Sequence, residues 1–333
     1  MRLHLNENNA GCSPAVLETL RRLGRSEVAF YPDYDTALAA VSGLFGVPVD
    51  HLLLTNGMDE GILAAAAAAC RDHANGIPEA VGVAPAFDEY EICTTAVGGR
   101  MVTVSLGDGF ELSAADIRAA LTPRTRIVFV ANPHNPSGRT VPLDTLRQLA
   151  CDVSPALMFV DEAYADFMGE SLIDPAAFAA LPNLVVGRTF SKAYGLAGLR
   201  AGVLVAAPDT LAPLRRVVPP YSLNAWAAAA LPVAIQDRAY RDWYLEQAAA
   251  SRALLTEACA RLNLPTWPSA ANFVLVRVPD AITLVRDLAA RGVRVRDRSA
   301  EAGCEQCIRV TAGIVDDTRR LIAALEEILC AGR

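Results

Sequence analysis

Short apolar runs alternate with longer amphipathic stretches between residues 52 and 205 of the chain. The apolar runs are rich in Val, Ile and Leu, as buried β-strands are, and the stretches between them have helical spacing. This alternation predicts an α/β fold in which helices flank a mostly parallel sheet. Strands are expected at residues 52–54, 80–84, 101–104, 126–131, 156–160, 184–186 and 201–205, and helices at residues 59–70, 87–97, 113–121 and 143–151.

The pattern changes after Pro232, where a long helical stretch at residues 240–262 begins a different order of elements. A helix followed by a few strands and a closing helix is typical of a smaller α+β unit. The expected strands are residues 273–278, 293–295 and 308–311, with a last helix at residues 316–329. We therefore predict a large domain at residues 30–235 and a small one made of residues 1–29 and 236–333.

Composition narrows the class of protein. The 333 residues are 53% apolar and 20% charged, which is typical of a globular chain and not of a disordered or fibrous one. The net charge of −7 has no long run of one sign, so neither nucleic acid nor a membrane surface is an expected partner. No apolar stretch is long enough for a membrane span, and residues 1–10 carry no export signal, so a cytoplasmic location is expected.

The eight cysteines are scattered and stand mostly singly among apolar neighbours, so reduced structural thiols are expected. Cys304 and Cys307 form one C-x-x-C pair. A zinc site needs four ligands, and neither a second pair nor a nearby histidine supplies the others. The sequence therefore predicts no metal site.

The basic residues are unevenly divided. Of the 30 lysines and arginines, Lys192 is the only lysine, so the other 29 are arginines. A codon bias towards Arg and Ala explains the low lysine count, but it does not explain why one lysine remains at this position.

Four polar loops follow expected strands, at residues 55–60, 132–138, 161–164 and 188–200. Ligands of open α/β sheets bind at this carboxyl edge of the strands. Each loop also has a plainer interpretation. The first can be a turn with Asp59 as the helix cap, the second a turn with Asx hydrogen bonds, and the acids of the third can be paired structurally.

Taken together, the loops carry the groups that bind pyridoxal phosphate. Residues 57–59 with Thr189, Ser191 and Arg200 can hold a phosphate, Asp161 can keep a pyridine nitrogen protonated, and Lys192 can form a Schiff base. Arginine cannot form one, because its guanidinium stays protonated. A nucleotide-binding protein or a non-catalytic binding module is the alternative class, but no G-x-G-x-x-G follows the first strand and no P-loop is present.

The motifs Asn-Pro-His-Asn-Pro-Ser-Gly (132–138), Asp-Glu-Ala-Tyr (161–164), Thr-Phe-Ser-Lys (189–192) and Gly-Leu-Arg (198–200) resemble those of the fold-type I pyridoxal-phosphate aminotransferases. Within that family the chain most resembles the histidinol-phosphate aminotransferases. The resemblance implies a ping-pong transaminase in which histidinol phosphate and 2-oxoglutarate give imidazole-acetol phosphate and glutamate. An aromatic amino-acid aminotransferase of the same family is the alternative, and a decarboxylase on this scaffold is another.

The resemblance also implies roles for individual residues. Lys192 would attach the cofactor and carry the proton, and Tyr31 would reach the phosphate of the partner subunit's cofactor, which implies a homodimer with shared sites. The other implied cofactor contacts are Asp161 at the ring nitrogen, Asn135 and Tyr164 at the ring oxygen, Phe87 on the ring face, and Met58, Asp59, Thr189, Ser191 and Arg200 at the phosphate.

Three further residues are implied at the substrate. Arg309 matches the arginine that binds the substrate carboxylate, although a surface arginine at a strand edge is the plainer interpretation. Arg296 resembles a second arginine associated with the substrate phosphate, and Asn8, in Asn-Glu-Asn (6–8), is the third. The chain departs from the family here, because Asn9 and Ala10 stand where Pro and an aromatic residue usually follow.

Overall fold

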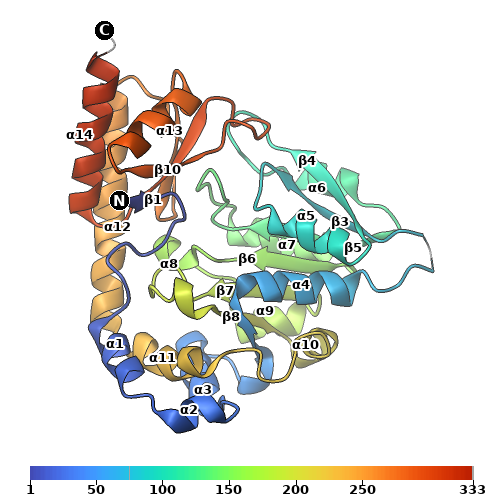
Figure 1. Cartoon of the computed structure of the whole chain (residues 1–333). Helices are drawn as coiled ribbons and strands as arrows, with labels where there is room; N and C mark the ends of the chain where they lie inside the picture. The colour runs from blue at the N-terminus through green and yellow to red at the C-terminus, as the bar shows by residue number, and fades with distance from the viewer. Residues whose placement is uncertain (75, 332–333) are drawn as a thin grey trace.

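The computed structural model describes residues 1–74 and 76–331, and a seven-stranded sheet forms its centre (Figure 1). The order of the strands is β2-β8-β7-β6-β5-β3-β4, and only β8 runs antiparallel to its neighbours, so the mostly parallel sheet is confirmed. The strands are β2 (Leu52–Asn56), β3 (Glu79–Ala84), β4 (Arg100–Ser105), β5 (Thr125–Ala131), β6 (Leu157–Asp161), β7 (Leu184–Thr189) and β8 (Ala201–Ala206).

Both faces of this sheet are covered, because successive residues of each apolar strand point to opposite faces. Val128 and Val130 face one hydrophobic core, whereas Ile127 and Phe129 face the other. The first core is packed by helices that include α3 (Asp35–Phe45), α6 (Ala114–Ala120), α7 (Leu143–Val153), α9 (Pro175–Ala180) and α11 (Ala225–Gln236), and the second by α4 (Gly57–Ala69), α5 (Glu89–Ala96) and α10 (Pro208–Arg215).

A second, four-stranded sheet has the order β1-β10-β11-β9 and its own core, which includes Leu3, Leu255 and Leu325. The helices α12 and α14 lie side by side next to it (Figure 1). Its strands are β1 (Arg2–Leu3), β9 (Phe273–Arg277), β10 (Arg294–Asp297) and β11 (Cys307–Thr311), and its helices are α12 (Arg238–Arg261), α13 (Ala281–Ala290) and α14 (Val315–Ala331).

The first 29 residues are divided between these two parts. β1 pairs with β10 of the small sheet, whereas α1 (Pro14–Arg21) packs on α11 and buries Val16 in the core of the large sheet. α2 (Arg25–Ala29) also packs on α11. The apolar face of α1 therefore lies against the large part, while β1 belongs to the small sheet.

Several short elements were not anticipated by the hydrophobic pattern. Most of them have fewer than three turns, so an apolar period barely repeats within them. These elements include α8 (Ala165–Met168) and the 3₁₀ turns η1 (Val49–His51) and η2 (Ala197–Leu199). The others are β1, α1, α2, α3, α9, α10, α11 and α13.

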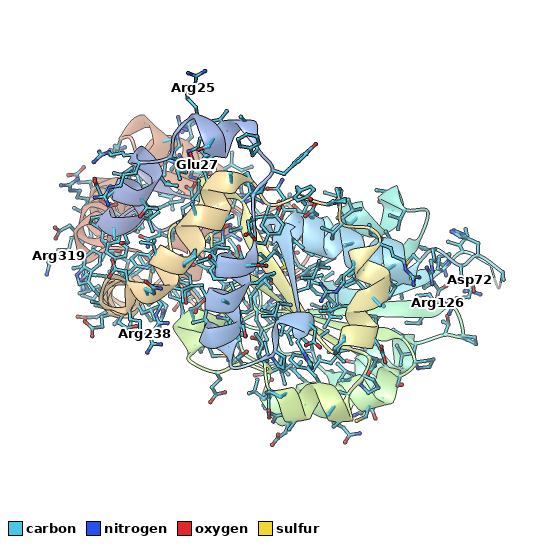
Figure 2. All side chains as sticks on the ribbon, turned by 90° about the horizontal axis from the view of Figure 1, so that it is seen from below. Arg25, Glu27, Asp72, Arg126, Arg238 and Arg319 are labelled. Carbon is cyan, nitrogen blue, oxygen red and sulfur yellow. The ribbon has the colours of Figure 1, made fainter. Side chains whose placement is uncertain are left out.

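Charged residues of both signs project from the surface, as Arg25, Glu27, Asp72 and Arg238 show (Figure 2). Within residues 1–74 and 76–331, every helix is too short or too polar to cross a membrane.

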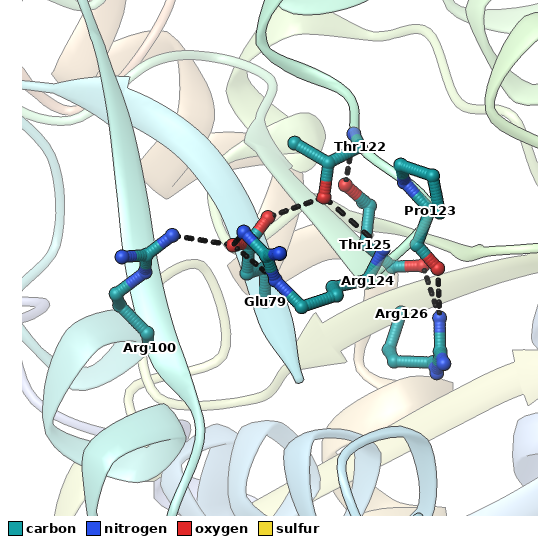
Figure 3. A network of polar contacts seen from close by, with 7 residues as sticks. All are labelled: Glu79, Arg100, Thr122, Pro123, Arg124, Thr125 and Arg126. Atoms are coloured by element: carbon teal, nitrogen blue, oxygen red, sulfur yellow. Dashed lines mark hydrogen bonds and ion pairs between the residues drawn. The ribbon is translucent and has the colours of Figure 1, made fainter. Parts of the chain in front are cut away.

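Glu79, the first residue of β3, is an acid whose side chain is fully buried. Its carboxylate accepts hydrogen bonds from Arg124 Nη2 and Thr122 Oγ1, each at 2.6 Å, and pairs with Arg100 of β4 (Figure 3). Burial alone would raise the pKa of Glu79, but the bonds from Thr122, Arg124 and Arg100 lower it to about 2. The network ties the start of β3 to the edge strand and to the turn before β5.

Replacing Glu79 with glutamine is expected to lower the free energy of unfolding at neutral pH by about 2 kcal/mol, because two arginines lose their charge partner. The effect is limited because Arg100 and Arg124 are 59% and 42% exposed and water screens them. Since folding lowers the pKa of Glu79, its contribution is present above the ordinary pKa of 4.5 and is lost as the pH falls towards 2. Urea unfolding of both proteins between neutral pH and about pH 3 should show the difference shrinking, and a constant difference would contradict this account.

Candidate active site

A cavity of about 450 Å³ lies where the carboxyl ends of β5, β6 and β7 face the small sheet. The two sheets contribute opposite walls. The residues predicted to bind the cofactor lie on the side of the large sheet, and two arginines lie on β10 and β11 of the small sheet. The predicted site residues that line it are Met58, Asp59, Phe87, Asn135, Asp161, Tyr164, Thr189, Ser191, Lys192, Arg200, Arg296 and Arg309. Twelve side chains from distant parts of the sequence are thus brought to one cavity.

Lys192 is half-buried in the loop that follows β7. Its Nζ atom donates a hydrogen bond to the backbone carbonyl of Leu5 at 3.0 Å and lies 5.8 Å from the centre of the Tyr164 ring. The hydroxyl of Tyr164 accepts a hydrogen bond from Asn6 at 3.0 Å. The amine is therefore held at the cavity by a neutral carbonyl and an aromatic face, and no carboxylate of the described chain pairs with it.

Asp161 ends β6, and its side chain is buried at the bottom of the cavity. Its Oδ1 accepts from the Ala163 backbone N–H at 2.9 Å and its Oδ2 from the Tyr90 hydroxyl at 2.7 Å. Burial raises the pKa of Asp161, and the two hydrogen bonds and the charge of Lys192 oppose this rise. The described residues place neither arginine nor lysine within ion-pair distance of Asp161, so a cationic N–H group would complete its surroundings.

The neighbouring acid has a different role. Glu162 directly follows β6, and its carboxylate lies 3.4 Å from the guanidinium of Arg188, which also pairs with Asp166 at 2.9 Å. The sequence predicts a cationic partner for both acids, because burying an unpaired charge is costly. Glu162 has such a partner within the chain, whereas the carboxylate of Asp161 lines the cavity without one. A pyridinium nitrogen bound in the cavity could therefore pair with Asp161.

The start of α4 has the shape of a phosphate cradle. Gly57 has a φ of +81°, and a Cβ atom there would lie 2.3 Å from Arg200 Nη2, so a side chain at this position would displace the guanidinium. Arg200 itself pairs with Asp59 at 2.8 Å. Among the described residues, no side chain caps the first N–H groups of the helix, which leaves the Met58 and Asp59 amides free to bind an anion.

Thr189 and Ser191 lie beside this cradle. The Ser191 backbone N–H donates to Thr189 Oγ1 at 3.2 Å, which holds the turn before Lys192, and both side chains line the cavity. Phe87 contributes the aromatic ring above the cavity and packs edge-on against Tyr90, with 5.9 Å between ring centres. A phosphate, an aromatic ring and a protonated ring nitrogen each have a matching group here, so the residues fit pyridoxal phosphate.

On the opposite wall, Arg296 and Arg309 are direct neighbours across β10 and β11. Arg309 is 7% exposed; it donates to Asn135 Oδ1 and, at 3.2 Å, to the His4 carbonyl. Burial lowers the pKa of Arg309, and the positive charges of Arg298 and Arg296 lower it further. Two cations side by side repel one another, and neither has an acidic partner in the described chain, so the pair favours an anionic ligand.

Two predicted residues lie outside this cavity. Tyr31 is 79% exposed and stacks on Tyr221, with 4.5 Å between ring centres. The side-chain amide of Asn8 donates to the Ala193 carbonyl at 3.2 Å, so Asn8 supports the loop that carries Lys192, while its neighbour Glu7 lines the cavity.

Tyr90, Arg298 and Leu5 are among the cavity residues that the sequence does not predict. Tyr90 lies three positions after Phe87, but no local pattern indicates that it meets an aspartate 71 positions later. Arg298 lies two positions beyond Arg296 and is 5% exposed, with Glu301 as its ion-pair partner. Leu5 contributes through its backbone carbonyl, which side-chain chemistry does not reveal.

The C-x-x-C pair spans the turn that leads into β11, whose first residue is Cys307, and both thiols are buried and free. Within residues 1–74 and 76–331, no group of His, Cys, Asp and Glu side chains is arranged to hold a metal ion.

A lysine amine and an unpaired buried carboxylate, set beside a phosphate cradle at the carboxyl edge of a mostly parallel sheet, define a fold-type I enzyme that uses pyridoxal phosphate. Comparison with known proteins agrees, because the sequence model of aminotransferase class I and II matches residues 1–325. The chain belongs to the aminotransferase class I and II family, whose members use this cofactor.

Two curated relatives carry the name histidinol-phosphate aminotransferase. Histidinol-phosphate aminotransferase 2 of Ralstonia nicotianae is 38% identical to this chain, over 99% of this chain and 88% of the relative. Histidinol-phosphate aminotransferase of Moorella thermoacetica is 35% identical, over 99% of this chain and 85% of the relative. A solved structure of histidinol-phosphate aminotransferase from Sinorhizobium meliloti with pyridoxal-5'-phosphate superposes with a TM-score of 0.89 at 26% identity, covering 100% of this chain and 91% of that one. The predicted family resemblance is thus confirmed, and the aromatic alternative is not favoured.

Proposed function

We propose that this aminotransferase moves an amino group between histidinol phosphate and 2-oxoglutarate. The observation that carries the proposal is the pair Arg296 and Arg309, which face the cavity side by side and have no acidic partner in the described chain. One substrate has a phosphate and the other has carboxylates, so both are anions for which these guanidinium groups provide matching donors. The shared name of the relatives supports the same substrate.

Different side chains of the cavity would carry different steps of the reaction. Pyridoxal phosphate, when bound, supplies an electron-withdrawing ring that stabilises negative charge on the α-carbon of an amino substrate. Lys192 is the group that would attach this cofactor, and its Nζ atom then takes and returns the proton at the α-carbon. Asp161 would hold the ring nitrogen, and Asn135 and Tyr164 the ring oxygen.

The phosphate of the cofactor would be held apart from the substrate. The Met58 and Asp59 amides, Thr189, Ser191 and Arg200 provide donors at one end of the cavity, and Phe87 would cover the ring face. Arg309 would bind the carboxylate of glutamate and Arg296 the phosphate of histidinol phosphate. Since one cavity serves both substrates, the product of the first half-reaction must leave before the second substrate enters.

The exposed apolar residues support a homodimer with shared sites. Val28, Phe30 and Tyr31 are 67%, 74% and 79% exposed, and Tyr221, against which Tyr31 stacks, is 52% exposed. A contiguous exposed apolar surface of this kind is typical of a protein interface. A second copy of the chain would bury it and would bring Tyr31 to the phosphate end of the partner's cavity. The seven cysteines with described side chains are all free, which is consistent with a place in the reducing cytoplasm.

Comparing amino donors tests the proposed reaction. The protein loaded with pyridoxal phosphate should transfer the amino group of histidinol phosphate to 2-oxoglutarate with a kcat/KM about 100-fold above that for phenylalanine, because only the former offers a phosphate to Arg296. A coupled assay for glutamate formation measures both. A preference for phenylalanine would contradict the proposed substrate while leaving the aminotransferase class intact.

A further inference from the structure

The hydroxyl of Tyr90 makes a direct contact with the predicted cofactor carboxylate. Tyr90 lies in the first turn of α5 and is 2% exposed, and its Oη atom donates to Asp161 Oδ2 at 2.7 Å. No pattern in the sequence assigns this tyrosine a role. The bond joins a helix on one face of the large sheet to the end of its strand β6.

The ring of Tyr90 is held on two sides. It stacks on Phe129 of β5 with 4.9 Å between ring centres and an interplanar angle of 8°, and it meets the edge-on ring of Phe87 at 5.9 Å. Phe129 in turn packs on Phe159 of β6 at 5.5 Å. Tyr90 therefore contacts both the aromatic ring and the carboxylate that would hold the cofactor ring, from a position fixed by the core.

The direction of the hydrogen bond is settled by charge. Burial and the neighbouring Asp161 raise the pKa of Tyr90 well above its ordinary value, so the phenol stays protonated and donates. The other donor to Asp161 is the Ala163 N–H, and the other charged groups that act on it are Asp59 at the start of α4 and Lys192 in the loop after β7. Tyr90 is thus the one side-chain hydroxyl in the described chain that donates to this carboxylate.

We propose that Tyr90 is a positioning residue that fixes the Asp161 carboxylate against the ring nitrogen of the cofactor. The inference rests on the proposed placement of pyridoxal phosphate, with Asp161 at that nitrogen. Without the hydroxyl, Asp161 keeps only the Ala163 donor, so its carboxylate turns more freely and its pKa rises. Both changes weaken its hold on a protonated ring nitrogen.

The variant Tyr90→Phe tests this, because it keeps the stacked ring and removes only the hydroxyl. We expect the dissociation constant for pyridoxal phosphate to rise about tenfold and kcat to fall about tenfold, as for the loss of one hydrogen bond to a charged group. The KM for the amino donor should change less than about threefold, since no substrate contact is lost. The acid side of the kcat profile should move up by about one pH unit, because Asp161 then protonates at higher pH.

Thr94→Val is the matched control. Thr94 lies one turn along α5, is fully buried, and donates its hydroxyl to the Tyr90 backbone carbonyl at 2.7 Å. Its loss perturbs the same helix but not Asp161, so cofactor affinity and the pH profile should stay as in the wild type. The visible absorption of the bound cofactor, titrated with pH in all three proteins, reports on the ring nitrogen independently of turnover.

The outcomes are distinct. A wild-type protein that binds no cofactor would overturn the proposed function itself. If the wild type binds the cofactor, and Tyr90→Phe has the same cofactor affinity and the same pH titration of the cofactor absorption, the positioning role alone is overturned. Equal changes in Tyr90→Phe and Thr94→Val would show that α5 acts only through the fold, which also overturns it.

Discussion

Replacing Lys192 with arginine is expected to lower kcat for transamination by about 10,000-fold, the upper range for the loss of a positioned proton carrier. Arginine keeps the positive charge, and it can still donate to the Leu5 carbonyl that Lys192 contacts. Its guanidinium stays protonated at neutral pH, so it can neither attack a carbonyl carbon nor act as a base. A glutamate-coupled assay measures the loss.

The binding of the cofactor should be affected much less than its attachment. The phosphate cradle at Gly57 and Arg200 does not involve Lys192, so the variant should still retain pyridoxal phosphate reversibly. Borohydride should fix the cofactor to Lys192 of the wild type, as seen by peptide mass, and to no residue of the variant. Substantial turnover by Lys192→Arg would show that another group carries the proton.

The same variant also tests the shared sites. If Tyr31 reaches the partner's cofactor, mixing Lys192→Arg with Tyr31→Ala should produce hybrids in which one site is complete. The mixture should then be more active than either variant alone. No gain after subunit exchange would argue against the proposed homodimer.

Replacing Arg296 with alanine is expected to lower kcat/KM for histidinol phosphate by about 100-fold, as for the loss of charge-assisted bonds to a phosphate. For phenylalanine, which has only a carboxylate, the change should be less than about threefold. The two arginines face each other across β10 and β11, so removing one also relieves the repulsion on the other. Steady-state kinetics with both donors separates the phosphate role from general loss of the cavity.

Arg309→Ala is the matched control for this prediction. Arg309 is the buried member of the pair and is held by Asn135 and the His4 carbonyl. Its loss should lower kcat/KM for the carboxylate substrates, including phenylalanine. If Arg296→Ala impaired both donors equally, Arg296 would not distinguish phosphate from carboxylate.

Much of the large sheet could be predicted because its strands are short apolar runs with marked ends. The expected strand at residues 126–131 and the observed β5 (Thr125–Ala131) differ by one residue. The candidate site residues could be proposed for the same reason, since polar loops at the ends of such strands share one edge of the sheet. Lys192 can also be singled out from the sequence, because it is the only lysine of the chain.

Other features depend on contacts that no local pattern carries. α1 begins with a Ser13 cap and a proline, which are local signals, yet its packing on α11 is set by residues more than 200 positions later. The bond from Tyr90 to Asp161 and the placement of Asn8 against Ala193 also join separate segments. Side-chain chemistry predicts what the proposed site needs, and the tertiary structure shows which of the candidate residues lie at one cavity.

The pairing of β1 with β10 has a consequence for the order in which the protein is made. Arg2 and Leu3 leave the ribosome long before their partners Arg294 and Val295 are synthesised. At about 5 to 20 residues per second, the first segment waits about 15 to 60 s for its neighbour. The wall that carries Arg296 and Arg309 is therefore completed after the large sheet has been synthesised, so the residues proposed to bind the cofactor emerge before those proposed to bind the substrate.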